Sequence, residues 1–198
     1  MLTISLDVDE RVEWWVPLVA GVRCVPHLLL NGVATAASVL AWLVTVPIVV
    51  VTGRVPRALS VFQVTVLRER ARTFGFLFAL RRSAPPFATT LSAEDPGDDP
   101  AFRISVPVAT RAPRWAPIGR LFVVAPHVLV LLPIGACLDA LYPLWMVLVS
   151  INGGWPAGMA RTLASIERWV VEVILYATMA TDQPPHFGFA FDREVAAV

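Results

Sequence analysis

The chain opens with hydrophobic and polar residues in strict alternation, continues into long apolar stretches, and then goes through the same order a second time. Alternation over residues 2–8 and again over 102–108 is typical of half-buried strands. A short alternation also follows a pair of prolines in each half, over residues 187–191 and, more weakly, over residues 87–91. We expect the opening and closing strands of each half to pair in a small sheet outside the membrane, because open sheet edges are not stable in hydrocarbon.

Two long apolar segments follow the opening strands. Residues 24–52 contain no charged side chain unless His27 is protonated. About 20 apolar residues cross a bilayer, so this segment is long enough to cross with tilt. Its counterpart, residues 121–151, is interrupted by Pro133, Asp139 and Pro143, which predicts a kinked or broken helix.

A second helix is predicted in each half, over about residues 56–80 and 156–180. Each follows a turn with glycine at the helix end and proline at the restart, at Gly53 and again at Gly153. We therefore expect a mainly α membrane protein of tandem two-helix repeats. It would have four membrane helices, some of them in an interfacial position, and a small extramembrane β-sheet of short strands.

The two halves match at an offset of 100 residues. The matches fall on scarce residue types: Trp15 and Trp115, Pro26-His27 and Pro126-His127, Gly53 and Gly153, Arg68 and Arg168. A repeat of this length is a whole folding unit. We divide the chain into a membrane repeat over residues 1–91, an acidic flexible linker over 92–100, and a second membrane repeat over 101–198.

Strands on one side of the membrane require an even number of crossings, so both termini and the linker would share that side. Arginines are more numerous there than at the helix turns, which predicts cytoplasmic termini in a multi-pass protein of the plasma membrane. In the alternative, the second helix lies flat among the headgroups because its cluster of charges at residues 68–72 is costly in hydrocarbon. The first segment then crosses once or forms a re-entrant hairpin.

Composition supports membrane residence. The chain is 57% apolar and only 16% charged, with a mean hydropathy of +0.67. Its net charge of +1 and its lack of a basic stripe argue against nucleic acid as a partner. Cys24 and Cys137 lie in apolar runs without metal-ligand spacing, so we expect buried thiols and neither a metal nor another cofactor.

Four elements of the first half form a recognisable pattern. They are Pro26-His27, the turn Thr-Gly-Arg-Val-Pro-Arg-Ala-Leu over residues 52–59, Arg68, and Pro-Pro-Phe over 85–87. This pattern resembles a bacterial domain-of-unknown-function family of small membrane proteins, common in actinobacteria, as a tandem pair. The second half departs from it at residues 152–157, which lack both turn arginines. The resemblance implies membrane placement and no particular reaction.

His27 and His127 are the most distinctive equivalent pair. Two imidazoles related by a pseudo-twofold axis could bind haem or a metal between helices. We favour the simpler interpretation that each Pro-His pair marks the start of a helix near the membrane interface. Asp139 has Val39 as its counterpart. A carboxylate inside a membrane segment is a candidate for an ion path or proton relay. The alternative is that Asp139 faces a water-filled break or the interface.

The remaining candidates are charged residues on or near the second helices: Arg54, Arg57, Arg68, Arg72, Arg168 and Glu172. Positions 72 and 172 are equivalent and oppositely charged, so Arg72 and Glu172 could pair across the pseudo-twofold axis. Alternatively the helix arginines bind anionic lipid. Arg54 and Arg57 at the turn are positioned to hold a headgroup phosphate or to snorkel.

No nucleophile motif, phosphate loop, zinc spacing or carboxylate pair occurs in the sequence. We therefore expect a non-catalytic accessory or assembly subunit of a larger plasma-membrane complex, with lipid and other integral membrane proteins as partners. Two alternatives stay open. One is a small transporter or channel component that uses Asp139 and the charged stripe, and the other is a protein that binds anionic lipid.

Overall fold

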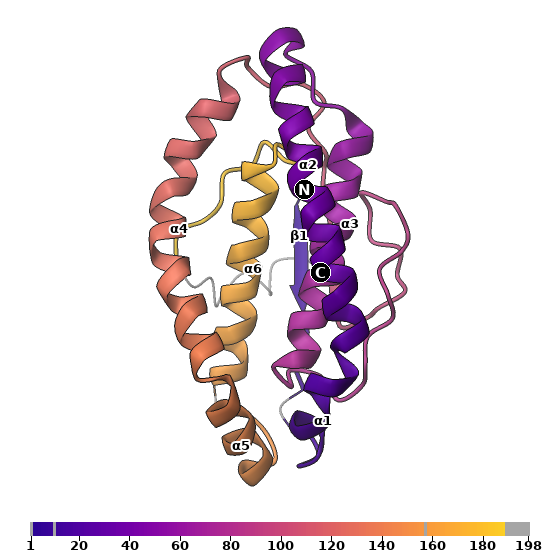
Figure 1. Cartoon of the computed structure of the whole chain (residues 1–198), viewed down its shortest axis with the longest axis vertical. Coiled ribbons are helices and arrows are strands. Elements are labelled where there is room, and N and C mark those ends of the chain that lie inside the picture. The colour runs from indigo at the N-terminus through magenta and orange to yellow at the C-terminus, as the bar shows by residue number, and fades with distance from the viewer. Residues whose placement is uncertain (1, 10, 157, 189–198) are drawn as a thin grey trace.

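The computed structural model describes residues 2–9, 11–156 and 158–188. Within these ranges the chain forms six helices and two short strands (Figure 1). The first repeat contains β1 (Thr3–Leu6), α1 (Val16–Arg23), α2 (Val25–Thr52) and α3 (Arg57–Leu77). The second contains β2 (Phe102–Ser105), α4 (Ala116–Ala140), α5 (Tyr142–Asn152) and α6 (Met159–Ala177). The predicted mainly helical architecture with a small sheet is confirmed.

The sheet joins the two repeats. β1 pairs with β2 in antiparallel register, and Ile4 lies opposite Ile104, its own counterpart in the 100-residue repeat. The expected pairing of opening with closing strands is therefore wrong for the first repeat, where residues 87–91 form no strand. Most of the expected closing strand over 187–191 lies outside the described residues. Each opening strand is therefore paired along one edge with its counterpart from the other repeat.

The two repeats run antiparallel to each other. α1 packs on α5, while the start of α4 packs near the end of α2. The backbone N–H of Val12 donates to the carbonyl of Gly153, and that of Ala112 donates to the carbonyl of Gly53, both at 3.1 Å. Each repeat thus docks its opening segment on the helix turn of the other.

The helices form two layers. α3 and α6 contact each other and are largely buried, whereas α2 and α4 lie outside them and are mostly exposed. In Figure 1, α4 and α5 run along one side of the molecule, α1, α2 and α3 along the other, and α6 and β1 between them. The sheet packs on the middle portions of α3 and α6, around Leu67 and Val171.

The helix ends follow from glycine and proline. α2 and α5 end at Gly53 and Gly153, which adopt φ of 68° and 64°, a left-handed conformation that glycine enters without steric cost. The predicted break in the second apolar segment is confirmed at Leu141, between α4 and α5. In the first repeat the break falls earlier, at Cys24, because α1 and α2 divide the equivalent helix there.

Only α2 and α4, among the described residues, are long and apolar enough to cross a membrane, instead of the four helices expected. α3 and α6 are not apolar enough to cross a membrane because they carry charged residues, several of which are buried against neighbouring segments. Both candidate spans are only 11% buried in their most apolar windows, whereas the core helix of a soluble protein would be mostly covered.

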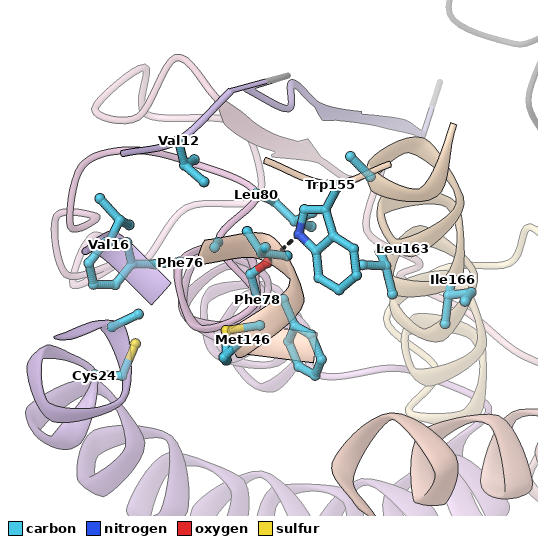
Figure 2. Close-up of a cluster of buried hydrophobic side chains, with 14 residues drawn as sticks. Val12, Val16, Cys24, Phe76, Phe78, Leu80, Met146, Trp155, Leu163 and Ile166 are labelled. Carbon is cyan, nitrogen blue, oxygen red and sulfur yellow. Dashed lines mark hydrogen bonds between the residues drawn. The ribbon is translucent and has the colours of Figure 1, made fainter. Parts of the chain in front are cut away.

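Apolar clusters hold the two ends of the molecule, and they differ in size. The larger one joins α1, α3, α5 and α6 around Phe76, Phe78 and Trp155 (Figure 2). The indole N–H of Trp155 donates to the carbonyl of Phe78 at 2.7 Å, so this buried ring has its polar group satisfied. At the opposite end the equivalent position is Val55, in a smaller cluster with Val49.

Candidate functional site

Glu69 is the centre of a buried polar cluster in the first repeat. It lies on the face of α3 that meets α2, and it is 2% exposed. One carboxylate oxygen lies 2.6 Å from Nδ1 of His27, and the other accepts the backbone N–H of Ala88 at 2.7 Å. Both oxygens are therefore satisfied, as a buried carboxylate requires.

The cluster continues one helical turn along both helices. Asn31 donates to the hydroxyl of Thr73 at 2.7 Å, and that hydroxyl donates to the backbone carbonyl of Glu69. The ring of Phe87 stacks on His27 with centroids 4.1 Å apart. The Pro-Pro-Phe segment thus closes over the histidine, which is only 4% exposed.

The acidic segment over residues 92–100 binds the side of α3 that carries Arg68 and Arg72, next to Glu69, and we call it the acidic strap. Asp98 receives two hydrogen bonds from Arg72, at 2.5 and 3.1 Å. Asp99 lies 2.6 Å from Arg81 and 3.5 Å from Arg72, and its side chain is fully buried. These two carboxylates thus neutralise buried arginines, a role that the sequence analysis did not assign to this segment.

Arg68 binds both the start of the strap and strand β2. Its guanidinium donates to the carbonyls of Ser92, Glu94 and Ile104, the last at 2.8 Å. Burial lowers the pKa of Arg68, an effect that the nearby carboxylate of Asp95 opposes. An arginine remains charged under these conditions, so it needs the three carbonyl dipoles around it.

The hydrogen bond with Arg72 holds the pKa of Asp98 below its usual value. Its carboxylate therefore stays ionised to lower pH than a free aspartate. The strap is consequently an anionic ligand of α3 over the whole physiological range.

The second repeat uses the same geometry with different chemistry. The residue 42 positions after His127 is Trp169, and its indole N–H donates to Nδ1 of His127 at 2.8 Å. Phe187 contacts both rings, as Phe87 contacts His27. The positions equivalent to Asn31 and Thr73 are apolar, so the cluster does not extend further here.

The predicted clasp between Arg72 and Glu172 does not form. Glu172 instead lies 3.2 Å from Arg168 on its own helix and 3.3 Å from His186. The two repeats lie antiparallel, and each position 72 or 172 faces the closing segment of its own repeat. One ion pair does join α3 to α6: Arg70 lies 3.0 Å from Glu167.

Glu167 is almost fully buried, and burial raises its pKa, with Arg70 opposing the shift. This pair is the direct charged link between the two inner helices among the residues described. The position equivalent to Glu167 is Leu67, so the link has no twin across the pseudo-twofold axis.

The remaining candidates lie on the surface. Arg54 and Arg57 are exposed at the turn before α3, and Arg54 forms a backbone bridge with Arg111. Asp139 is exposed two residues before the break at Leu141. It does not line the apolar cavity of about 310 Å³ at that break, which is formed by Pro133, Ile134, Cys137, Leu138, Leu141 and Trp145.

A haem or metal between the two histidines is not supported by their placement, because each is enclosed within its own repeat. Within the described ranges, no group of three His, Cys, Asp or Glu side chains could hold a metal ion. What the polar residues of the first repeat can do is hold His27 against Glu69 and fix the strap and the Pro-Pro-Phe segment on α3.

Sequence reasoning missed Glu69, Asp98, Asp99 and Arg81 as site residues. The signal for Glu69 was its place in a helical run that otherwise holds arginines. The signal for Asp98 and Asp99 was that their charge is opposite to that of the arginines on α3 and just after it. Opposite charges on segments close in sequence are candidates for mutual burial.

Comparison with known proteins adds no further constraint, because no protein-family model, curated protein or solved structure matches this chain.

Proposed function

We propose that the protein is a non-catalytic accessory or assembly subunit that resides in the plasma membrane as part of a larger complex. The observation that carries this proposal is the uncovered apolar surface of α2 and α4. Large side chains such as Leu29, Val33, Leu129 and Leu132 are 66–76% exposed there. A monomer in water does not tolerate a patch of this kind.

The polar interior supports the same proposal. Buried charged side chains of the first repeat are engaged with the strap and with backbone groups around α3. Such a network gives the fold a fixed shape and a definite partner for each buried charge. A rigid frame with an apolar exterior suits a structural role within a membrane assembly.

Glycines on the outer helices provide a way to test for a partner helix. A Cβ added at Gly32 or Gly135 would meet nothing within 4 Å, so these positions are open to close approach by a neighbour. Gly32→Leu would fill that space without disturbing the protein's own packing. Val33→Leu, at an already bulky and exposed neighbouring position, is the matched control.

The test is purification of the tagged chain from its native membranes in mild detergent, with quantification of co-purifying integral membrane proteins. We expect a stoichiometric partner with the wild type and with Val33→Leu, and a reduced yield of that partner with Gly32→Leu. A wild-type chain that purifies alone and monodisperse contradicts the accessory role. Ion flux by that lone protein, dependent on Asp139, would establish the transporter alternative instead.

A further inference from the structure

We infer that the protein lies flat in one leaflet of the bilayer, with α2 and α4 parallel to the membrane plane. The outer face, meaning the exposed side of α1, α2, α4 and α5, is then embedded among acyl chains. The sheet and the acidic strap face water on the same side of the membrane. This inference rests on the proposed membrane residence and specifies how the chain is seated.

The internal symmetry sets the possible orientations. Ile4 pairs with its counterpart Ile104, so the pseudo-twofold axis passes between them, perpendicular to the strands. β1 runs along the same direction as α3 and α6 in Figure 1, so the axis is perpendicular to the helices as well. If α2 and α4 lie in the membrane plane, this axis is the membrane normal and both repeats meet the lipid equally.

A spanning orientation would place polar backbone at the bilayer centre. The sheet packs on the middle of α3 and α6, beside Leu67 and Val171 and not beyond either helix end. With α2 and α4 upright, the sheet, the strap and the exposed side chain of Arg103 would lie at mid-membrane depth. A two-stranded sheet cannot close its edges there, and hydrocarbon offers no hydrogen-bond partners.

Charge is segregated between the two faces of the molecule. α1, α2, α4 and α5 are described in full, and their exposed charged residues are Arg23 and Asp139, each within two residues of a helix break. The sheet and strap side exposes Asp7, Glu94 and Arg103. A wide apolar surface opposite a charged one is the pattern of proteins that lie in the membrane interface.

The exposure of the outer helices matches a half-embedded position. α2 touches the rest of the protein through one narrow edge, which includes His27, Thr45 and Val49, and presents its other sides outward. Trp15 and Trp115 are exposed just before α1 and α4. The symmetry puts these two tryptophans at equal depth, where a row of interfacial aromatics is expected.

The test is labelling of single cysteines in sealed membrane vesicles with a membrane-impermeant maleimide. The parent carries Cys24→Ala and Cys137→Ala. Glu13→Cys and Pro113→Cys introduce thiols at equivalent exposed positions at opposite ends of the molecule. Arg103→Cys marks the sheet, and Leu40→Cys marks the outer face.

In-plane seating predicts that Glu13→Cys, Pro113→Cys and Arg103→Cys are labelled from one and the same side. Leu40→Cys should be labelled at least ten-fold more slowly until detergent is added. Labelling of Glu13→Cys and Pro113→Cys from opposite sides, with Arg103→Cys protected, would overturn the in-plane inference and leave membrane residence intact. Recovery of the chain in the soluble fraction would overturn both the in-plane seating and membrane residence. That outcome also covers a soluble dimer, in which a second copy and not lipid would protect Leu40→Cys.

A measurement on the wild type covers the case in which a cysteine variant does not fold. Hydrogen exchange is compared for the protein in liposomes and in detergent micelles. In-plane seating predicts equal exchange of the strap amides over residues 92–100 in both, because water reaches them in each. Slower exchange of these amides in liposomes would show that lipid covers the strap, which contradicts the inference.

Discussion

Among the described residues, the first repeat buries more polar and charged side chains than the second, although both have the same fold. His27 contacts a carboxylate at the position where His127 contacts an indole. Arg72 binds Asp98 in the strap, whereas Glu172 binds Arg168 and His186. The backbone geometry of the repeat therefore does not depend on one set of side-chain contacts. The two repeats differ in the segment that their buried charges bind. Those of the first repeat bind the strap, and those of the second bind its own closing segment.

Of the substitutions that test this difference between the repeats, removal of the Asp99 carboxylate should reduce stability most. Asp99→Ala leaves Arg81 without its buried carboxylate and takes one of two from Arg72. We expect a loss of about 3–5 kcal/mol in the free energy of unfolding, at roughly 2–4 °C of melting temperature per kcal/mol. Thermal unfolding in mild detergent measures it.

The control for Asp99→Ala is Asp182→Ala in the second repeat. Asp182 pairs with Arg120, but its side chain is 60% exposed and Arg120 also donates to two backbone carbonyls. That change should cost less than about 1 kcal/mol. Equal melting temperatures for the two variants would contradict a special role for the strap.

The histidine contacts of the two repeats should differ in strength. Glu69→Leu leaves the backbone N–H of Ala88 and the ring of His27 without their buried acceptor, which costs about 1–3 kcal/mol or somewhat more for a charged group. Trp169→Phe removes one neutral hydrogen bond to His127, at about 0.5–1.5 kcal/mol. Chemical denaturation of both variants compares them, and a larger loss for Trp169→Phe would reverse the ranking.

Position 75 shows how closely the sheet approaches α3. A Cβ at Gly75 would lie 2.1 Å from the buried ring of Phe102, whereas one at Gly135 would meet nothing. Gly75→Ala should cost about 1–3 kcal/mol from overpacking, offset by up to about 1 kcal/mol of helix propensity. Gly135→Ala should keep that propensity gain. Melting temperatures that rise for both variants would indicate a sheet loosely placed on α3.

The pH dependence of stability should be opposite in sign for Asp98 and Glu167. It is the smallest of the effects predicted for the two repeats. The pKa of Asp98 is lowered in the folded state, so its contribution is present above its unfolded pKa and is lost as pH falls through the folded one. The pKa of Glu167 is raised, so its contribution is present at acid pH and is lost as pH rises through the folded pKa.

Melting curves from pH 4 to 8 in detergent test these opposite signs. The melting temperature of Glu167→Gln should rise relative to that of the wild type as pH increases, because the buried side chain of the variant cannot ionise. Asp98→Asn should differ most from the wild type at neutral pH and converge with it in acid. Parallel curves for the two variants would show that neither carboxylate titrates differently on folding.

The sequence predicted the helix ends at Gly53 and Gly153 and the break near Pro143, because these depend on local backbone chemistry. It did not predict that the opening strands pair with each other, since alternation marks a strand and not its partner. Four membrane helices were expected because hydropathy does not show that the arginines of α3 have the carboxylates of the strap as buried partners. Asp98 and Asp99 looked like linker residues for the same reason.

The pairing of Ile4 with Ile104 also bears on how such a chain can arise. An antiparallel strand that matches its own copy makes an isologous contact, the type found in twofold dimers. The hydrogen bonds from Val12 to Gly153 and from Ala112 to Gly53 are likewise a reciprocal pair. A separate 100-residue chain would therefore satisfy the same contacts by homodimerising. Fusion of two copies fixes their one-to-one ratio and frees each half to change alone.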